Sequence, residues 1–154
     1  MGRRQLNVPF LLVIVAVFGV FVWLVCQVGY WFSPGYRSHQ VVEEFYTHEQ
    51  DSHYSESWEL LHPLMKERWG KGTWMQDRAH VFNNHFGAET FDFTIEKVDK
   101  VKGWRMEQES RRFEVAYQFH VEQTYSGKYG TFAFLQEVYV VKGKKDWKVL
   151  WDYK

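Results

Sequence analysis

The sequence predicts an α+β protein: an N-terminal transmembrane helix, then three helices packed on a curved antiparallel sheet of about four strands. Three observations indicate this class. Residues 8–32 hold no charged side chain. From there to Gly87 apolar residues recur every three to four positions, which is the period of an α-helix. After Gly87 they recur at every second position, which is the period of a β-strand.

The first element is the apolar run VPFLLVIVAVFGVFVWLVCQVGYWF, residues 8–32. As a helix it would rise roughly 37 Å, and a bilayer core is about 30 Å thick. Arg3 and Arg4 precede it, so positive charge places residues 1–7 in the cytoplasm and the chain beyond the run outside. The run is longer than a signal-peptide core and lacks a small-residue cleavage site, which favours an uncleaved anchor. An inverted topology stays open because Arg37 follows the run.

The part after the anchor is expected to begin with a linker, SPGY at residues 33–36, followed by one domain over residues 37–154. Three helices are predicted in its first half. The first covers RSHQVVEEFYTHEQDS. The second begins at the N-cap Ser52 and ends at Pro63, and the third begins near Thr73 after the break GKG.

Four strands are predicted in the second half: FDFTIEKV, RRFEVAYQFHVEQTY, YGTFAFLQEVYVV and WKVLWDYK. The short turns SGK and KGKKD make the last three an antiparallel meander. The third strand is apolar on both faces, which is typical of a strand covered on two sides. The last is expected to be an integral strand that closes the sheet, with Trp147, Val149 and Trp151 buried against the helices.

The segments VVEEFYTHEQDSHYSESWELLHP and DWKVLWDYK resemble the nuclear-transport-factor-2-like (NTF2-like) superfamily over residues 37–154. The ending is similar to the W-x-V-x-W segment that closes the NTF2-like N-terminal domain of some class B penicillin-binding proteins. The resemblance implies a cone of helices on a curved sheet, present here as a stand-alone module behind an anchor.

The resemblance also implies a cavity, because NTF2-like isomerases and dehydratases place Asp, His or Tyr inside the cone. The candidate cavity residues are Tyr117, His120, Gln136, Glu137 and Asp152. A carboxyl group in such a cavity would have a raised pKa and could move protons. Consecutive strand residues face opposite sides, however, and no Asp–His pair falls where a proton relay would form. We therefore expect no catalytic residues.

No metal or cofactor site is expected. The two histidines of HEQDSH are five positions apart, which on a helix points them about 140° away from each other. The single cysteine, Cys26, excludes an intrachain disulfide and a Cys-rich zinc site. The 19 Lys and Arg balance 19 Asp and Glu, which argues against a nucleic-acid partner.

Two features are candidates for partner contacts. Trp69 and Trp74 flank GKG and would form a partner site if exposed, with core packing as the alternative. Lys142, Lys144 and Lys145 in the turn KGKKD could touch anionic lipid or cell-wall polymer, with a solvated turn as the alternative.

The sequence therefore predicts a non-catalytic single-pass protein of a bacterial cell membrane. Its extracytoplasmic domain would be an accessory or scaffold subunit in cell-wall synthesis or in a conjugation or secretion channel. It would contact the bilayer through residues 8–32 and a membrane or envelope protein through the domain. The alternative function is a small-molecule binder or a lyase or isomerase that uses the cavity. The oligomeric state stays open.

Overall fold

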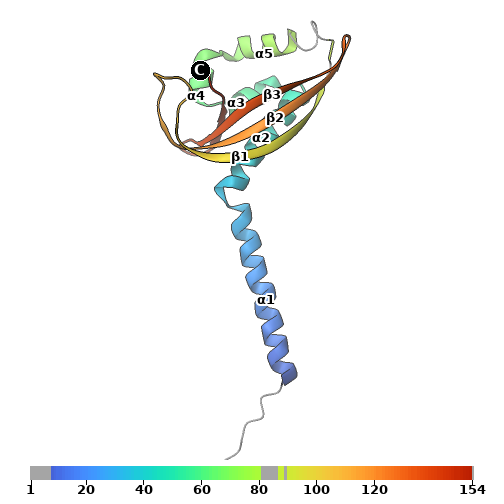
Figure 1. Cartoon of the computed structure of the whole chain (residues 1–154), viewed down its shortest axis with the longest axis vertical. Helices are drawn as coiled ribbons and strands as arrows, with labels where there is room; N and C mark the ends of the chain where they lie inside the picture. Colours follow the sequence, from blue (N-terminus) through green and yellow to red (C-terminus); the bar gives the residue numbers. More distant parts are fainter. Residues whose placement is uncertain (1–7, 81–86, 89, 154) are drawn as a thin grey trace, which may run out of the picture. The chain divides into compact units, whose positions relative to one another are not determined.

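The computed structural model describes residues 8–80, 87–88 and 90–153, and the chain divides into two compact units, Met1–Tyr36 and Arg37–Lys154. In the first unit, α1 (Val8–Trp31) is a single helix of 24 residues (Figure 1). Its stretch Leu12–Trp31 has a mean hydropathy of 2.6, and none of it is buried. The helix is therefore long and apolar enough to cross a membrane.

Most of the segment SPGY is helical, because α2 (Pro34–Gln50) begins within it. The Ser33 hydroxyl accepts a hydrogen bond from the Tyr36 backbone N–H at 3.2 Å, which is the geometry of a helix N-cap. Pro34 follows as the first helical residue, where its missing N–H leaves no bond unmade. The Pro-Gly pair thus starts a helix here.

Three short helices follow in the second unit: α3 (Tyr54–Leu60), α4 (Pro63–Arg68) and α5 (Lys71–Ala79). The described part of the domain thus holds four helices, α2 to α5, where three were predicted. The difference lies at Pro63, which opens α4 instead of only ending α3. The His62 ring nitrogen Nδ1 accepts a hydrogen bond from the Leu64 N–H at 3.2 Å and caps this extra helix.

The start of α5 also differs, because Gly70 and not Thr73 precedes its first turn. The helical period predicted up to Gly87 also covers residues 81–86, which lie outside the described residues. Gly87 has a φ of +61°, the left-handed conformation that glycine adopts freely.

The second half forms one antiparallel sheet in the order β1 (Phe91–Trp104), β2 (Phe113–Gly127), β3 (Gly130–Lys142) and β4 (Trp147–Leu150). The predicted α+β class and the antiparallel pairing of the strands are therefore confirmed. Figure 1 shows β1, β2 and β3 bending together as one curved layer.

The last strand, β4, is part of the sheet, as expected, and lies at its edge. β4 pairs with only Tyr139–Lys142 of β3, and its other side meets the α3–α4 junction through a parallel bridge between Leu61 and Val149. The His62 N–H donates to the Val149 carbonyl at 2.9 Å. Val149 is fully buried, as expected, whereas Trp147 and Trp151 are half-buried.

β3 is not covered on both sides along its whole length. Val138–Val141 are buried, but residues 130–137 are exposed or half-buried. Phe134 and Leu135 keep 45% and 71% of their surface exposed. Among the described residues, this first part of β3 also has no strand paired on its outer edge, because β4 pairs only with Tyr139–Lys142.

The core lies between α2 and the sheet face that α2 covers. Tyr46 of α2 packs on Phe93 of β1 with ring centroids 5.8 Å apart. Its hydroxyl donates to the Gln136 side chain of β3 at 2.9 Å. The residues that are fully buried here include Val42, Phe45, Leu61, Met65, Phe119, Val121, Val138 and Val140.

Candidate functional site

A pocket walled by aromatic rings opens beside α5. It has a volume of about 320 Å³ and is lined by Trp69, Trp74, Asp77, Arg78, Trp151 and Tyr153; we call it the aromatic pocket. Trp74, Asp77 and Arg78 stand at positions i, i+3 and i+4 of α5, so one helix face supplies half of the lining. Trp69 follows α4, and the other two residues follow β4.

Two of the rings that line the aromatic pocket, Trp74 and Trp151, also pack against the hydrophobic core. The rings of Trp74 and Trp151 have centroids 5.9 Å apart, and Trp151 also packs on Phe45 of α2 at 6.4 Å. Trp74 is only 4% exposed. These contacts hold both indole rings in place, so the pocket is preformed.

The polar atoms of the aromatic wall bond to one another. The Tyr153 hydroxyl accepts hydrogen bonds from Nε1 of Trp69 at 2.7 Å and Nε1 of Trp151 at 3.0 Å. The Arg68 guanidinium lies 3.8 Å from the centre of the Tyr153 ring. With their N–H groups paired, the indoles present apolar ring faces to the pocket, and these favour apolar or aromatic groups.

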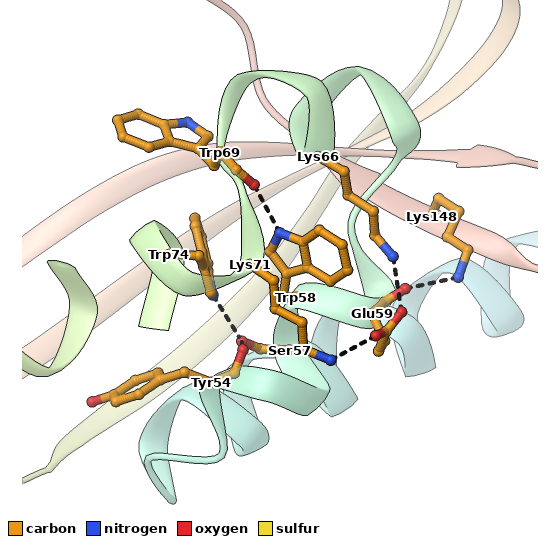
Figure 2. A network of polar contacts seen from close by, with 9 residues as sticks. All are labelled: Tyr54, Ser57, Trp58, Glu59, Lys66, Trp69, Lys71, Trp74 and Lys148. Atoms are coloured by element: carbon orange, nitrogen blue, oxygen red, sulfur yellow. Dashed lines mark hydrogen bonds and ion pairs between the residues drawn. The ribbon is translucent and has the colours of Figure 1, made fainter. Parts of the chain in front are cut away.

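A buried ion pair lies behind the pocket. Arg78 Nε is 3.1 Å from Glu49 Oε2, and the Glu49 side chain is 4% exposed. The Ser57 hydroxyl donates to Glu49 Oε1. It also accepts a hydrogen bond from Trp74 Nε1 at 3.2 Å (Figure 2). The Arg78 guanidinium also lies 4.4 Å from the centre of the Trp74 ring. Arg78 thus connects the pocket wall to the buried carboxylate.

The electrostatics of this pair have a clear direction. Burial raises the pKa of the Glu49 carboxyl, and Arg78 together with the Ser57 hydrogen bond partly opposes that rise. Burial also raises the pKa values of the Tyr46 and Tyr125 phenols. Tyr125 donates to the Gln123 amide oxygen at 2.9 Å, and Tyr46 likewise donates to an amide. Both phenols therefore stay protonated, and their protons are held by neutral acceptors.

A second network holds the pocket's helices together. Trp58 Nε1 donates to the Trp69 carbonyl at 2.8 Å (Figure 2). Glu59 on the same helix bridges Lys66 at 3.0 Å and Lys71 at 2.8 Å. Hydrogen bonds from Lys71 and Lys66 lower the pKa of the Glu59 carboxyl to about 2. These bonds join α3, α4 and α5, and thereby position Trp69.

The structure places the five candidate cavity residues apart. By strand alternation, Tyr117 and Gln136 share the face that α2 covers. His120 and Glu137 lie on the opposite face, where their side chains are 3.5 Å apart. Asp152 is half-buried in the segment after β4.

The two candidate tryptophans, Trp69 and Trp74, do come together, but as walls of a pocket and not as an exposed patch. The sequence reasoning missed Glu49 and Arg78. A signal was present, because Glu49 continues the buried face of α2 seven residues after Val42. An acid on an apolar helix face indicates a buried partner.

In the described part of the chain, no group of three or more His, Cys, Asp or Glu residues is placed to hold a metal ion. Comparison with known proteins gives no match: no family model fits the chain, and no relative is found among curated proteins.

Proposed function

We propose that this chain is a non-catalytic, single-pass protein of a bacterial cell membrane that docks a protein partner through the aromatic pocket. Helix α1 would be the anchor, and residues 37–154 would be an extracytoplasmic NTF2-like domain. The observation that carries the proposal is the pocket itself: it is preformed and apolar, and it lies at the surface between α5 and the segment after β4.

The pocket has the composition of an interaction hot spot. Tryptophan, tyrosine and arginine are the residue types that dominate binding energy at protein interfaces, and they act best as fixed anchors in water-excluding hollows. A volume of about 320 Å³ holds one or two large side chains. Asp77 and Arg78 bring one charge of each sign to the lining, which supplies polar contacts for the partner's backbone.

The NTF2-like assignment rests on the quoted sequence resemblance and is compatible with four helices beside a curved antiparallel sheet. A role as a scaffold subunit in cell-wall synthesis, or in a conjugation or secretion channel, follows from that resemblance. A reporter enzyme active only outside the cytoplasm, fused after Lys154, tests the topology. Activity of this reporter supports an outward domain. An inactive reporter, together with activity of a second reporter that works only in the cytoplasm and is fused at the same place, contradicts it.

The docking proposal is tested by photo-crosslinking from position 77 in the full chain. A partner band should form with the otherwise unchanged protein. It should disappear with Trp151→Ala, which removes a pocket wall, and persist with Met75→Ala, an exposed neighbour on α5 outside the lining. Near-ultraviolet circular dichroism checks that each variant is folded. A band that survives Trp151→Ala in a folded protein contradicts docking in the pocket.

A small-molecule binder or an isomerase is the second candidate, and one observation favours it: a buried carboxyl of raised pKa, Glu49, beside the tyrosines Tyr46 and Tyr125. Against it, both Glu49 oxygens are engaged, one by Ser57 and one by Arg78. An apolar fluorescent probe tests it. If the unchanged protein and the Glu49→Gln variant bind the probe with the same affinity from pH 5 to pH 8, this candidate is removed.

A further inference from the structure

A second hollow, separate from the aromatic pocket, lies beside the turn between β3 and β4. It has a volume of about 730 Å³. Its charged lining residues are Arg111, Lys142, Lys144, Lys145, Asp146 and Lys148, and we call it the basic groove. His62, Pro63 and Phe113 add the end of the α3–α4 junction and an apolar ring to its wall.

Positive charge is concentrated in this groove. Five cationic side chains line it against one carboxylate. The whole of residues 37–154 holds 17 Lys and Arg, which is 19 less Arg3 and Arg4, against 19 Asp and Glu. A unit with a small acidic excess thus carries a local excess of four positive charges. Such segregation raises the local concentration of anions.

The charges on the turn are not neutralised by neighbouring acids. Among the described residues, Lys142, Lys144, Lys145 and Arg111 form no ion pair. Lys148 Nζ donates to the Glu59 backbone carbonyl at 2.9 Å, a neutral acceptor that leaves its charge in place.

Two further acids, Glu44 and Glu59, line a hollow next to the groove. Lys145, Asp146 and Lys148 also border this hollow. The Glu59 carboxylate is already bonded by two other lysines, as described above. The groove therefore keeps its positive character.

The turn that carries the lysines has a defined backbone. The Gly143 N–H donates to the Asp146 carbonyl at 2.7 Å. A Cβ at position 143 would stand 2.9 Å from that same carbonyl oxygen, closer than real Cβ atoms approach, so glycine is required. The closed turn holds the backbone beneath Lys142, Lys144 and Lys145 in one arrangement beside the groove.

The histidine in the wall of the groove, His62, is half-buried. The pKa of His62 is lowered to about 4, first by burial and then by the positive charges of Arg111 and Lys148. The ring is therefore neutral at physiological pH, and it already caps α4 through Nδ1.

We propose that the basic groove binds a ligand carrying at least two phosphate groups. Four of its five cations are lysines, which bind phosphate as point charges, and Arg111 adds a planar guanidinium that can bind phosphate oxygens in a bidentate manner. The volume exceeds that of a single phosphate, and the Phe113 ring offers an apolar surface to the rest of an ester. The phosphates belong either to a soluble polymer or to clustered anionic phospholipid headgroups.

The test uses the full chain in an uncharged detergent at low salt, with isothermal titration as the readout. The probes are inorganic tripolyphosphate, micelles doped with an anionic phospholipid, and polyglutamate. Lys144→Gln with Lys145→Gln removes two charges from the groove. The matched control, Lys100→Gln with Lys102→Gln, removes two exposed lysines from β1. Melting curves confirm that both variants fold.

The groove variant should bind the phosphate probe about 25-fold more weakly, which is about five-fold for each attraction across about 4 Å of water. The control should bind within about two-fold of the unchanged chain, and added salt should weaken binding. Binding of tripolyphosphate alone assigns the soluble source, and binding of doped micelles alone assigns the headgroups. Equal weakening in both variants, no binding of either phosphate probe, or tighter binding of polyglutamate would overturn the proposal.

Discussion

Replacing Arg78 by methionine should destabilise the second unit by an amount that grows with pH. Methionine keeps the apolar length of the side chain over the Trp74 ring and removes the charge that faces Glu49. Breaking a buried ion pair from one side costs about 3–5 kcal/mol. Arg78 is 20% exposed, so we expect the lower end, about 3 kcal/mol, at pH 8.

The pH dependence follows from the Glu49 carboxyl. Its pKa in the folded protein is raised, so protonated Glu49 favours folding and ionised Glu49 opposes it. Without Arg78 that pKa rises further. Below the ordinary glutamate range both proteins hold a neutral carboxyl and differ little. As pH rises, the free energy of unfolding of the parent stops falling once its Glu49 is ionised. That of the variant continues to fall, by up to about 1.4 kcal/mol per pH unit, because its Glu49 ionises at a higher pH.

The assay is urea unfolding of the full chain in detergent, followed by near-ultraviolet circular dichroism at pH 5 and pH 8. The control is Arg68→Met, since Arg68 pairs with Glu107 at the surface and such a pair contributes about 0–1 kcal/mol. Adding Glu49→Gln to Arg78→Met should recover most of the loss at pH 8. A loss below about 1 kcal/mol at pH 8, or one that is equal at both pH values, would refute the reasoning.

Three further outcomes are expected. Leu61→Ala should destabilise the unit by about 2–5 kcal/mol in urea unfolding, whereas Leu135→Ala, 71% exposed, should stay within about 0.5 kcal/mol; equal effects would contradict the buried bridge to β4. Because the pKa of His62 is lowered to about 4, the protein should lose stability as pH falls from about 6.5 to 4, by about 1 kcal/mol after solvent screening, and His62→Asn should lack this loss. Truncation after Asp146 removes β4, so the melting transition should disappear; a truncated chain with an unchanged melting curve would show that β4 is dispensable.

The sequence predicted which segments form helices and strands better than it predicted how these elements pack against one another. The change of apolar period at Gly87 correctly separates helices from strands because both periods reflect burial of one face. The β4 strand was expected within the sheet with Trp147 and Trp151 buried against the helices, and it lies at the sheet edge with both rings half-buried. Aromatic residues also bury well at an edge when another segment covers them, and the α3–α4 junction does so.

The candidate site was predicted only in part for a similar reason. Trp69 and Trp74 were identified because they flank the helix-breaking segment GKG. Their partners Trp151 and Tyr153 lie more than seventy positions further along the sequence. Arg78 was not identified from the sequence as a site residue. Its bond to Glu49 joins α5 to α2, and no local pattern encodes that contact.

The bridge between Leu61 and Val149 has a consequence for the order of folding during synthesis. The two residues are 149 − 61 = 88 positions apart, and ribosomes add roughly 5–20 residues per second. The strand that covers Leu61 is therefore synthesised roughly 4–18 seconds after Leu61 itself. During this interval the nascent chain exposes a leucine that becomes fully buried in the finished fold, and the contact forms late because closing so long a loop is entropically slow.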